Sequence, residues 1–359
     1  MKILHFITSL RTGGAERLLT GLLPRLRDRG HSVELLVMDG TRTHFTEALE
    51  ASGIAVHALA EGAAAMHNPL LAPRLRRFMA RGGYDIAHTH NTPAQALCAL
   101  VAPRACTLIT TEHNTTNRRR GSRLWLPADR LLYARYRAIV ACGDETASSL
   151  LAYMPALAPK LHTVANGIDL GAFAGAAPAA DIAARFAGRR IIVMAAAFRP
   201  QKDQPTLLKA MALLPDDYAL VLAGEGDTAE ACRALALQLG IGHRVHFAGV
   251  RTDIPALYAA ADAIVLSTHH EGLSLSAIEA MASGTPLVAS DVDGVRLSAA
   301  EGAILFPPGD TEALAATLHA LCTNPSLRER AADAGRRRAA LFDIDRTAEG
   351  YDRIYNNLS

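Results

Sequence analysis

Two carboxylates eight positions apart stand out among the residues that could do chemistry. Glu271 and Glu279 lie in HHEGLSLSAIEAMASGTPLVAS, which follows an apolar run at Ala263–Ser267 and leads into a helix. A carboxylate on the first turn of a helix can accept hydrogen bonds from both vicinal hydroxyls of a ribose, and the N–H groups around Leu273–Leu275 can bind a pyrophosphate. A simpler interpretation stays open, because Ser276 and Glu279 also have the spacing of a helix capping box.

Two cations follow another predicted strand. Arg199 and Lys202 lie in AAAFRPQKDQPTLLKA, after the run Ile191–Ala196. Ligands of doubly wound α/β folds bind at the carboxyl ends of the strands, so these cations are placed to meet one. Two positive charges suit a diphosphate whose negative charge grows as it leaves. The alternative is that both are ordinary solvated loop residues.

A glycine pair follows the first predicted strand. Gly13 and Gly14 lie in ITSLRTGGAERLL and open a helix, so bare N–H groups and the helix dipole could meet a phosphate. A tight structural turn is the alternative. The pair is not part of a G-x-G-x-x-G fingerprint, which argues against a nicotinamide-dependent dehydrogenase.

Other polar residues end strand-like runs in the same way. A lone histidine at a strand end is more often structural than catalytic, but joint placement at one sheet edge favours a functional site. These residues are His88 and His90 in DIAHTHN, His113 in TTEHNT, Asn166 and Asp169 in ANGID, and Gly224 in LAGEGD.

No metal site or disulfide framework is expected. Asp291 and Asp293 form a D-x-D pair, but no histidine, asparagine or further carboxylate accompanies them nearby. The five cysteines are scattered, odd in number and form no C-x-x-C pair, which suits small buried side chains in a reducing compartment.

The elements that must position these residues repeat one pattern, in which apolar runs alternate with helical stretches. This alternation is typical of a parallel sheet whose buried strands are covered by helices on both faces. The runs are Ile3–Thr8, Val33–Met38, Ala55–Leu59, Ile86–His90, Thr107–Thr111 and Ala138–Ala141 in the first half, and Ile191–Ala196, Tyr218–Ala223, Val245–Ala248, Ala263–Ser267, Leu287–Ala289 and Ile304–Phe306 in the second.

Two complete sets of runs predict two doubly wound domains in a chain of 359 residues. We expect a first domain over 1–170, an alanine-rich linker over 171–188, a second domain over 189–340, and a C-terminal helix over 341–359. The charges are asymmetric: residues 1–170 hold 20 Lys and Arg against 13 Asp and Glu, and residues 171–359 hold 17 against 22. Different partners for the two domains would explain this asymmetry.

Taken in order, these segments resemble the family 4 glycosyltransferases, retaining enzymes of the GT-B architecture. The resemblance runs from GGAER through TEHN, ANGID, FRPQKD, AGEGD, TDIPALYAAADAIVLST and EGLSLSAIEAMASGTPLVAS to PPGD. It implies two Rossmann-like doubly wound parallel-sheet domains facing across an interdomain cleft. It also implies that the C-terminal helix crosses back onto the first domain.

The resemblance assigns roles to individual residues of the second half. Glu279 would hold the ribose hydroxyls, and Glu271 would lie against the donor sugar. Lys202 would neutralise the diphosphate, and the backbone at Val250 and Arg251 would read the base.

In the first half, the resemblance implies that Gly14 lets the N-terminal loop close on the phosphates and that His113 lies near the reacting sugar. The catalytic candidates are therefore Glu271, His113 and Lys202. The donor-binding candidates are Gly13, Gly14, Arg199, Lys202, Gly224, Val250, Arg251, Glu271, Gly272, Leu273, Ser274, Leu275 and Glu279.

Such enzymes are thought to work by front-face attack, in which the leaving phosphate oxygen takes the acceptor proton, so neither a cofactor nor a metal is expected. Two positions depart from the family pattern. Ala197 stands where an Arg usually precedes the phosphate-binding Lys, and Leu297 stands where a Glu is usual. Arg199 could reach the same phosphate as the missing Arg. The alternative is a catalytically weak nucleotide-binding or scaffold protein.

The activity that the resemblance implies is transfer of a hexose from a nucleoside-diphosphate sugar, with UDP favoured, in polysaccharide or glycoconjugate synthesis. The acceptor is expected to be a glycan or a lipid-linked molecule. Residues 118–137 hold seven Arg with Trp125, Tyr133 and Tyr136 interleaved, which suits an anionic membrane or a lipid-linked diphosphate as well as a solvated helix face. No reader motif for nucleic acid accompanies the charge. The acceptor-side candidates are His88, His90, Arg118, Arg119 and Arg120.

The opening run is too short for a signal peptide, and no run is long enough to span a bilayer. We therefore predict a cytoplasmic protein that can contact the inner face of the membrane.

Overall fold

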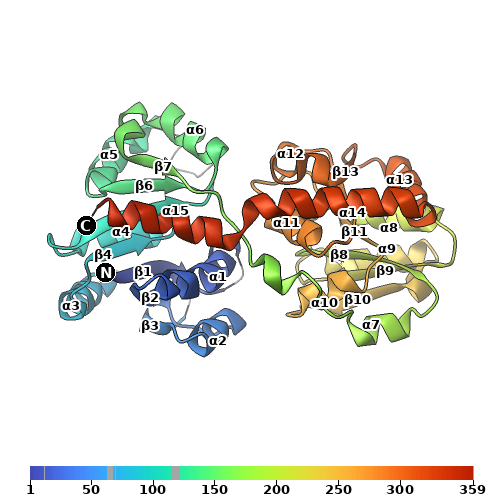
Figure 1. The fold of residues 1–359 in the computed structure, drawn as a ribbon, viewed down its shortest axis with the longest axis horizontal. Helices are drawn as coiled ribbons and strands as arrows, with labels where there is room; N and C mark the ends of the chain where they lie inside the picture. Colours follow the sequence, from blue (N-terminus) through green and yellow to red (C-terminus); the bar gives the residue numbers. More distant parts are fainter. Residues whose placement is uncertain (12, 63–67, 69, 115–121, 359) are drawn as a thin grey trace. The chain divides into compact units, whose positions relative to one another are not determined.

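The structure is a computed structural model that describes residues 1–11, 13–62, 68, 70–114 and 122–358. Its contacts divide the chain into two units. The first comprises Met1–Gly167 with Ile344–Ser359, and the second comprises Ile168–Asp343. Each unit has a parallel sheet with helices on both faces, which confirms the predicted pair of Rossmann-like domains (Figure 1).

The first unit contains a seven-stranded sheet in the order β3-β2-β1-β4-β5-β6-β7, with every neighbouring pair parallel. Its strands are β1 (Lys2–Ser9), β2 (Ser32–Asp39), β3 (Ala55–Ala60), β4 (Ile86–Thr89), β5 (Thr107–Glu112), β6 (Ala138–Ala141) and β7 (Leu161–Thr163). Its helices are α1 (Gly14–Asp28), α2 (His44–Ala51), α3 (Leu71–Gly82), α4 (Thr92–Val101), α5 (Leu126–Ala134), α6 (Asp144–Tyr153) and α15 (Ile344–Asn356), with 3-10 turns η2 (Arg123–Trp125) and η3 (Pro155–Lys160).

The C-terminal helix α15 packs on α1 within the first unit. Ile344, Ala348, Tyr351 and Tyr355 recur every three or four residues and are buried in one core with α1 and β1. This spacing places them on one face of a helix, so the amphipathic pattern explains both the helix and its docking. Helices α3, α4 and α5 contribute to a separate core on the other face of the sheet.

The second unit has a six-stranded parallel sheet in the order β10-β9-β8-β11-β12-β13. Its strands are β8 (Arg190–Ala195), β9 (Tyr218–Ala223), β10 (Val245–Gly249), β11 (Ala263–Leu266), β12 (Leu287–Ser290) and β13 (Ala303–Phe306). Its helices are α7 (Ala180–Arg185), α8 (Gln204–Leu213), α9 (Ala229–Gln238), α10 (Ile254–Ala259), α11 (Leu275–Ala282), α12 (Asp293–Ala299), α13 (Thr311–Thr323) and α14 (Pro325–Ala339), with 3-10 turns η4 (Leu170–Ala172), η5 (Pro200–Lys202), η6 (Gly242–Arg244), η7 (Ala300–Gly302) and η8 (Ala340–Phe342).

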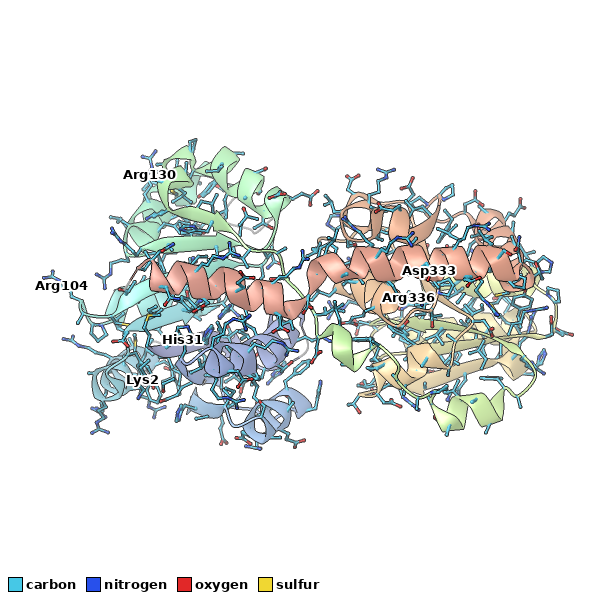
Figure 2. The ribbon with its side chains drawn as sticks, in the orientation of Figure 1. Lys2, His31, Arg104, Arg130, Asp333 and Arg336 are labelled. Carbon is cyan, nitrogen blue, oxygen red and sulfur yellow. The ribbon has the colours of Figure 1, made fainter. Side chains whose placement is uncertain are left out.

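Helix α14 presents one apolar and one charged face. Ala332, Gly335 and Ala339 are its buried residues, and they recur every three or four positions. Asp333 and Arg336 lie on the charged face and form an ion pair across three residues (Figure 2). The small buried residues let the helix pack closely on α11.

Residues 171–188, the segment predicted as a linker, contribute four buried side chains to a core of the second unit: Phe173, Ala179, Ile182 and Phe186. The order of strands reverses between β8 and β11, where the chain has left β8 first toward β9 and later toward β11. Ligands of open α/β sheets bind at such a point, beyond the carboxyl ends of the strands. The candidate residues of the second half lie there.

Candidate functional site

The loops that follow β8 and β11 bring Lys202 and Glu271 together. Because these strands are neighbours in the sheet, their carboxyl ends open onto the same edge. The N–H of His269 donates to the carbonyl of Gln201 at 2.9 Å, which ties one loop to the other. Lys202 Nζ donates to Glu271 Oε1, and the two side chains are only 18% and 10% exposed. Lys202 and Glu271, which are 69 residues apart in the sequence, thus form one partly buried ion pair.

Hydroxyl groups at the end of β11 hold the Lys202 loop in place. Ser267 Oγ donates to the carbonyl of Asp203 at 3.0 Å, and Thr268 Oγ1 donates to the carbonyl of Gln201 at 3.1 Å. Asp203 has φ of 43° and ψ of 46°, and its carboxylate accepts from the N–H of Thr206 as the cap of α8. The loop is therefore positioned by its backbone, independently of the Lys202 side chain.

The N-terminus of α11 differs from the capping box that the sequence allowed. The helix cap is Ser274, whose Oγ accepts from the N–H of Ala277 at 3.3 Å, so Ser276 is already inside the helix. Glu279 therefore lies more than one turn into α11, where its side chain is 2% exposed. The capping-box interpretation is wrong, and Glu279 stands as a buried carboxylate behind the helix N-terminus.

The same N-terminus presents donors that an anion could use. Across the part of the chain that the structure describes, the N–H groups of Leu273, Ser274 and Leu275 make no hydrogen bond. These N–H groups and the helix dipole favour negative charge. Together with Lys202 in the adjoining loop, they could neutralise a diphosphate.

Gly294 fixes the loop that carries Glu271, a role that the sequence did not predict. A Cβ at Gly294 would lie 2.0 Å from the carbonyl oxygen of Gly272 and 2.2 Å from that of Glu271. Only glycine allows α12 to pack this closely on a backbone. Gly294 is visible in DVDGVR, but a single glycine does not by itself indicate which backbone approaches it.

Gly224 brings the loop after β9 against the loop after β8. Its φ is +139°, and a Cβ there would lie 2.1 Å from the carbonyl oxygen of Ala196. Gly226 approaches the carbonyl of Phe198 in the same way, at 2.2 Å. Gly224, a predicted site residue, therefore lies directly beside the segment that precedes Arg199 and Lys202.

The remaining candidates of this unit, Arg199, Arg251 and Val250, differ in the contacts that their side chains make. Arg199 is exposed, and no ion pair involves its side chain within the described ranges. Arg251 donates to Asp181 at 2.6 Å and to Asp253 at 2.6 Å, and these bonds, first that to Asp181, raise the pKa of its guanidinium. Val250 is exposed beside it.

Arg296 occupies the D-x-D pair. Its Nε donates to Asp291 Oδ1 at 2.6 Å and its Nη1 to Asp293 Oδ1 at 3.1 Å. The Arg296 side chain holds the pKa of the Asp291 carboxyl below its usual range. The two carboxylates thus have an internal cation.

In the first unit, the start of α1 carries an acid of its own. Gly13 is the helix cap and Gly14 the first helical residue. A Cβ at Gly13 would lie 2.1 Å from a carboxylate oxygen of Glu16, so that carboxylate covers the place predicted for a phosphate. Burial raises the pKa of Glu16.

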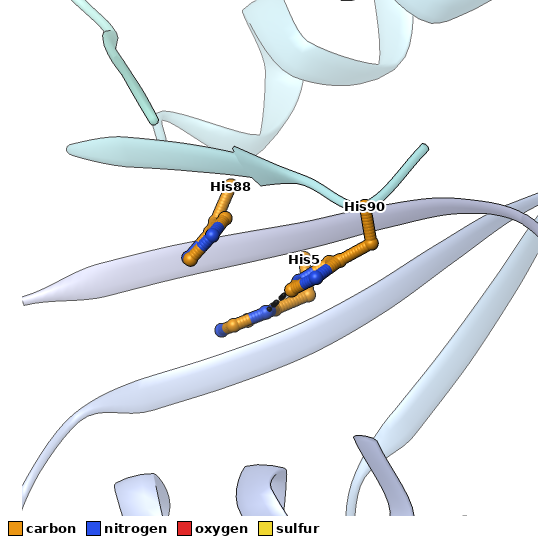
Figure 3. Close-up of side chains that lie close together, drawn as sticks. All are labelled: His5, His88 and His90. Atoms are coloured by element: carbon orange, nitrogen blue, oxygen red, sulfur yellow. Dashed lines mark hydrogen bonds between the residues drawn. The ribbon is translucent and has the colours of Figure 1, made fainter. Parts of the chain in front are cut away.

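Three histidines from β1 and the end of β4 lie close together on one face of the sheet of the first unit (Figure 3). His5 and His88 are partners in the register of these strands, and His90 lies two residues beyond His88 on the same face. All three are fully buried. His88 and His90 were predicted on the acceptor side, but in this structure neither is exposed to an acceptor.

His113, the catalytic candidate, is joined to this stack. Its Nε2 lies 3.2 Å from Nδ1 of His90, and Nε2 of His90 lies 2.8 Å from Nδ1 of His5. We call the series His113, His90 and His5 the histidine chain. Burial lowers the pKa of His5 to about 3, that of His113 to about 4, and that of His90 well below its ordinary value. The imidazoles of the chain are therefore neutral at pH 7.

His5, His88 and His90 also bring nitrogen atoms within 4.8 Å of one another, the spacing of a metal cluster. Their rings are nearly parallel, however, at 12° to 27° and centroid separations of 4.5 to 5.1 Å. Stacked imidazoles direct their lone pairs side by side, whereas ligands of one ion must converge on it. The arrangement suits hydrogen bonding better than coordination.

Residues 118–137, which were predicted to form a basic and aromatic surface, differ from that prediction in their tyrosines. Arg118, Arg119 and Arg120 lie outside the described residues. Tyr133 and Tyr136 are both only 2% exposed, so the prediction of interfacial tyrosines is wrong. Tyr133 of α5 and Tyr136, which follows that helix, both belong to a core of the first unit. Trp125 remains exposed.

No helix within the described part of the chain is long and apolar enough to cross a membrane.

Comparison with known proteins associates each half of the chain with one family model. The model described as "Glycosyltransferase Family 4" matches residues 12–172, and the one described as "Glycosyl transferases group 1" matches residues 180–338. The two matches meet near the boundary between the structural units.

Similar curated proteins include a phosphatidyl-myo-inositol mannosyltransferase of Mycobacterium leprae, which is 27% identical over 97% of this chain and 94% of its own. The putative glycosyltransferase EpsD of Bacillus subtilis is 34% identical over 46% of this chain and 45% of its own. Among solved structures, Anabaena Alr3699/HepE in complex with UDP-glucose superimposes with a TM-score of 0.83 at 22% identity, covering 99% of this chain and 100% of the other. The fold is therefore GT-B.

Proposed function

We propose that this chain, which belongs to the family 4 glycosyltransferases, moves a hexose from a UDP-sugar to a glycan or lipid-linked acceptor with retention of configuration. Members of this family transfer sugar from a nucleotide sugar. The observation that carries the proposal is the group formed by the Lys202–Glu271 ion pair, the open N-terminus of α11 and the buried Glu279. The three features lie on one edge of one sheet.

Each part of the nucleotide sugar has a chemical partner in this group. Glu279 would accept hydrogen bonds from the two ribose hydroxyls, and the N–H groups of Leu273–Leu275 would meet the diphosphate. Lys202 would place its ammonium on the same diphosphate. Glu271, which holds Lys202 before the donor binds, would then lie beside the transferred sugar.

The residues support a front-face displacement. The bond between the anomeric carbon and the phosphate oxygen breaks while the acceptor oxygen bonds to that carbon on the same face. The leaving phosphate oxygen takes the acceptor proton, so atoms and charge balance without a protein nucleophile. Lys202, Arg199 and the helix N-terminus stabilise the negative charge that develops on the diphosphate.

We propose uridine as the base. The UDP and UDP-glucose complexes of HepE, which shares this fold, favour it. The mannosyltransferase relative supports a hexose as the transferred sugar and a lipid as the acceptor.

A thermal-shift panel with UDP, GDP, ADP and NAD tests the proposal. We expect UDP to raise the melting temperature, since a ligand at about 100 times its dissociation constant stabilises a fold by about 2.7 kcal/mol. Glu279→Ala should lose most of that shift, whereas Glu312→Ala, on the exposed face of α13, should keep it. A shift with NAD alone, or an equal UDP shift in Glu279→Ala, would contradict the donor site.

We extend the proposal to peripheral contact with an anionic membrane. Arg74, Arg76, Arg77 and Arg81 are all exposed on α3, whose opposite face is buried. Each basic residue near an anionic surface contributes about 1 kcal/mol. Flotation with vesicles containing an anionic lipid should recover the protein, and neutralising Arg118–Arg120 together with the α3 arginines should abolish recovery. Absence of binding in the unaltered protein would contradict the extension.

A further inference from the structure

We propose that the histidine chain lets Tyr355, on the C-terminal helix α15, determine which ring nitrogen of His113 carries the proton. Tyr355, His5 and His90 are then positioning residues, because they act on His113 and not on a substrate. The proposal rests on the proposed function only in adopting the place of His113 near the reacting sugar that the family resemblance implies. All its members lie within the first unit.

Tyr355 joins the end of the histidine chain to His88. Its hydroxyl lies 2.6 Å from Nδ1 of His88 and 3.5 Å from Nε2 of His5. On the far side of His88, Nε2 lies 2.7 Å from Thr111 Oγ1. A continuous series of polar contacts therefore runs from His113 through β4 and β1 to α15 and back to β5.

The proton positions along this series depend on one another. A neutral imidazole has one N–H donor and one lone pair, so when one nitrogen donates, the other must accept. Burial lowers the pKa values of all four histidines, which keeps each ring neutral. The chain consequently has two arrangements, with every proton directed toward Tyr355 or every proton directed toward His113.

The contacts of Tyr355 select the first arrangement. At 2.6 Å, its contact with His88 is shorter than the usual range for an N–H donor and suits a hydroxyl donor. The single Tyr355 proton therefore points to His88. Toward His5 the same oxygen can only accept, so its 3.5 Å contact, which is at the long limit for a hydrogen bond, favours a proton on Nε2 of His5, and the rest of the chain follows.

The other end of the chain selects the same arrangement. Nδ1 of His113 is buried and has no hydrogen-bond partner among the described residues. A buried N–H without an acceptor is among the rarest defects of a folded protein, so this atom is better placed as a lone pair. His113 Nε2 then carries the proton and donates to His90, in agreement with the assignment from Tyr355.

This assignment states what His113 offers a ligand. A lone pair on Nδ1 could accept from a sugar hydroxyl that displaced the groups covering this nitrogen, whereas Nδ1–H would require an acceptor there. It also accounts for the presence of three polar rings where the sheet could hold aliphatic side chains. Burying them carries a desolvation cost that only a fully connected network offsets.

Nitrogen NMR of protein labelled with 15N-histidine can read the tautomers, because protonated and unprotonated ring nitrogens resonate far apart. We expect His113, His90 and His5 each to carry the proton on Nε2, with the His113 signals identified by their loss in His113→Gln. Tyr355→Phe keeps the ring and removes the hydroxyl. The tautomer ratio of His113 should then change about five-fold, the equivalent of one ordinary hydrogen bond.

Tyr136→Phe is the matched control. Tyr136 lies in the same unit and is also buried, and its hydroxyl donates to the carbonyl of Gln95 at 2.7 Å, outside the series of contacts that links the histidines. It should leave the His113 ratio unchanged. Three results would overturn the proposal: Nδ1–H on His113 in the unaltered protein, equal changes in both variants, or a metal ion on the histidines of the purified protein. None of these readouts depends on the donor, so they are distinguishable from failure of the nucleotide panel.

Once a donor is identified, the same variants gain a kinetic readout. Tyr355→Phe should lower kcat about 10-fold, as is typical when a group that orients an active-site ligand is removed. The KM for the donor should change little, because an altered tautomer affects the transition state more than ground-state binding. An unchanged kcat together with an altered tautomer would overturn the role of His113 in the transfer.

Discussion

Replacing Glu271 by Gln should strengthen nucleotide binding while it weakens sugar transfer. In the structure the Glu271 carboxylate holds Lys202, the cation that we propose for the diphosphate. A diphosphate must therefore compete with Glu271 for the ammonium and also approach its negative charge. Glutamine has nearly the same shape and removes both obstacles, but it cannot offer a carboxylate to the donor sugar.

The size of the gain follows from the ion pair. Two unit charges about 4 Å apart interact by about 4 kcal/mol at an effective dielectric constant of about 20. The amide that Glu271→Gln introduces would retain a hydrogen bond to Lys202 of about 1 kcal/mol. Hydration of the released ammonium, which is already 18% exposed, offsets roughly half of the remainder. A net gain of about 1.4 kcal/mol corresponds to roughly ten-fold tighter UDP binding.

Titration calorimetry with UDP measures this on the unaltered protein, Glu271→Gln, Lys202→Met and the double variant. Lys202→Met should weaken binding at least ten-fold, and in its background Glu271→Gln should have a smaller effect, because the two residues are coupled. Glu312→Gln serves as a control for the loss of one carboxylate elsewhere in the same unit. Transfer in Glu271→Gln should fall on the order of 100-fold despite the tighter binding.

Equal or weaker UDP binding in Glu271→Gln would refute the reasoning, since it would show that Glu271 supports the diphosphate site and does not compete for its cation. Additive effects in the double variant would refute the coupling.

Three further outcomes are expected. Gly294→Ala should remove the UDP-dependent thermal shift while costing the free protein only about 1–3 kcal/mol, because its Cβ meets backbone oxygens at 2.0 Å and displaces the Glu271 loop. Ala197→Arg should tighten UDP binding several-fold in calorimetry, since it adds a cation beside the diphosphate loop. Acid should destabilise the first unit, because the folded-state pKa values of His5, His88, His90 and His113 lie below the unfolded value of about 6.5. The unfolded state therefore binds more protons as the pH falls from about 6.5 toward 4, and each of these histidines lowers the free energy of unfolding by about 1.4 kcal/mol per pH unit. Fluorescence of Trp125, the only tryptophan, reports urea unfolding of that unit at pH values of about 7.5 and 5.5, and an unchanged midpoint would contradict the neutral chain.

Most of the fold could be predicted because a parallel strand that is buried on both faces appears in the sequence as a short continuous apolar run. Every strand-like run in both halves corresponds to a strand of the structure. The strand that was not predicted is β7, Leu161–Thr163, which has three residues and whose side chains are largely exposed. A strand that short has no room for a hydrophobic pattern, and its pairing with β6 is specified by the surrounding fold.

The site could be predicted only in part, because sequence patterns reveal which residues follow strands but not which way their side chains are buried. Lys202 and Glu271 were recognised separately, and their pairing required the adjacency of β8 and β11. His88 looked like a residue of a ligand-facing edge. It contacts Tyr355 of α15, 267 residues later, which no local pattern around His88 could reveal.

The glycines explain how this site can depart from the family pattern at Ala197 and keep its shape. Gly224, Gly226 and Gly294 each place an absent Cβ within 2.0 to 2.2 Å of a carbonyl oxygen in the loops after β8 or β11. These loops are thus held by backbone packing, together with the hydroxyl bonds from the end of β11. A side chain at position 197 contributes charge to such a loop without being needed to build it. We therefore expect the absence of an arginine there to lower affinity for a diphosphate while Lys202 and the α11 N-terminus stay in position. The second unit should then retain a donor site that restoring the charge would strengthen.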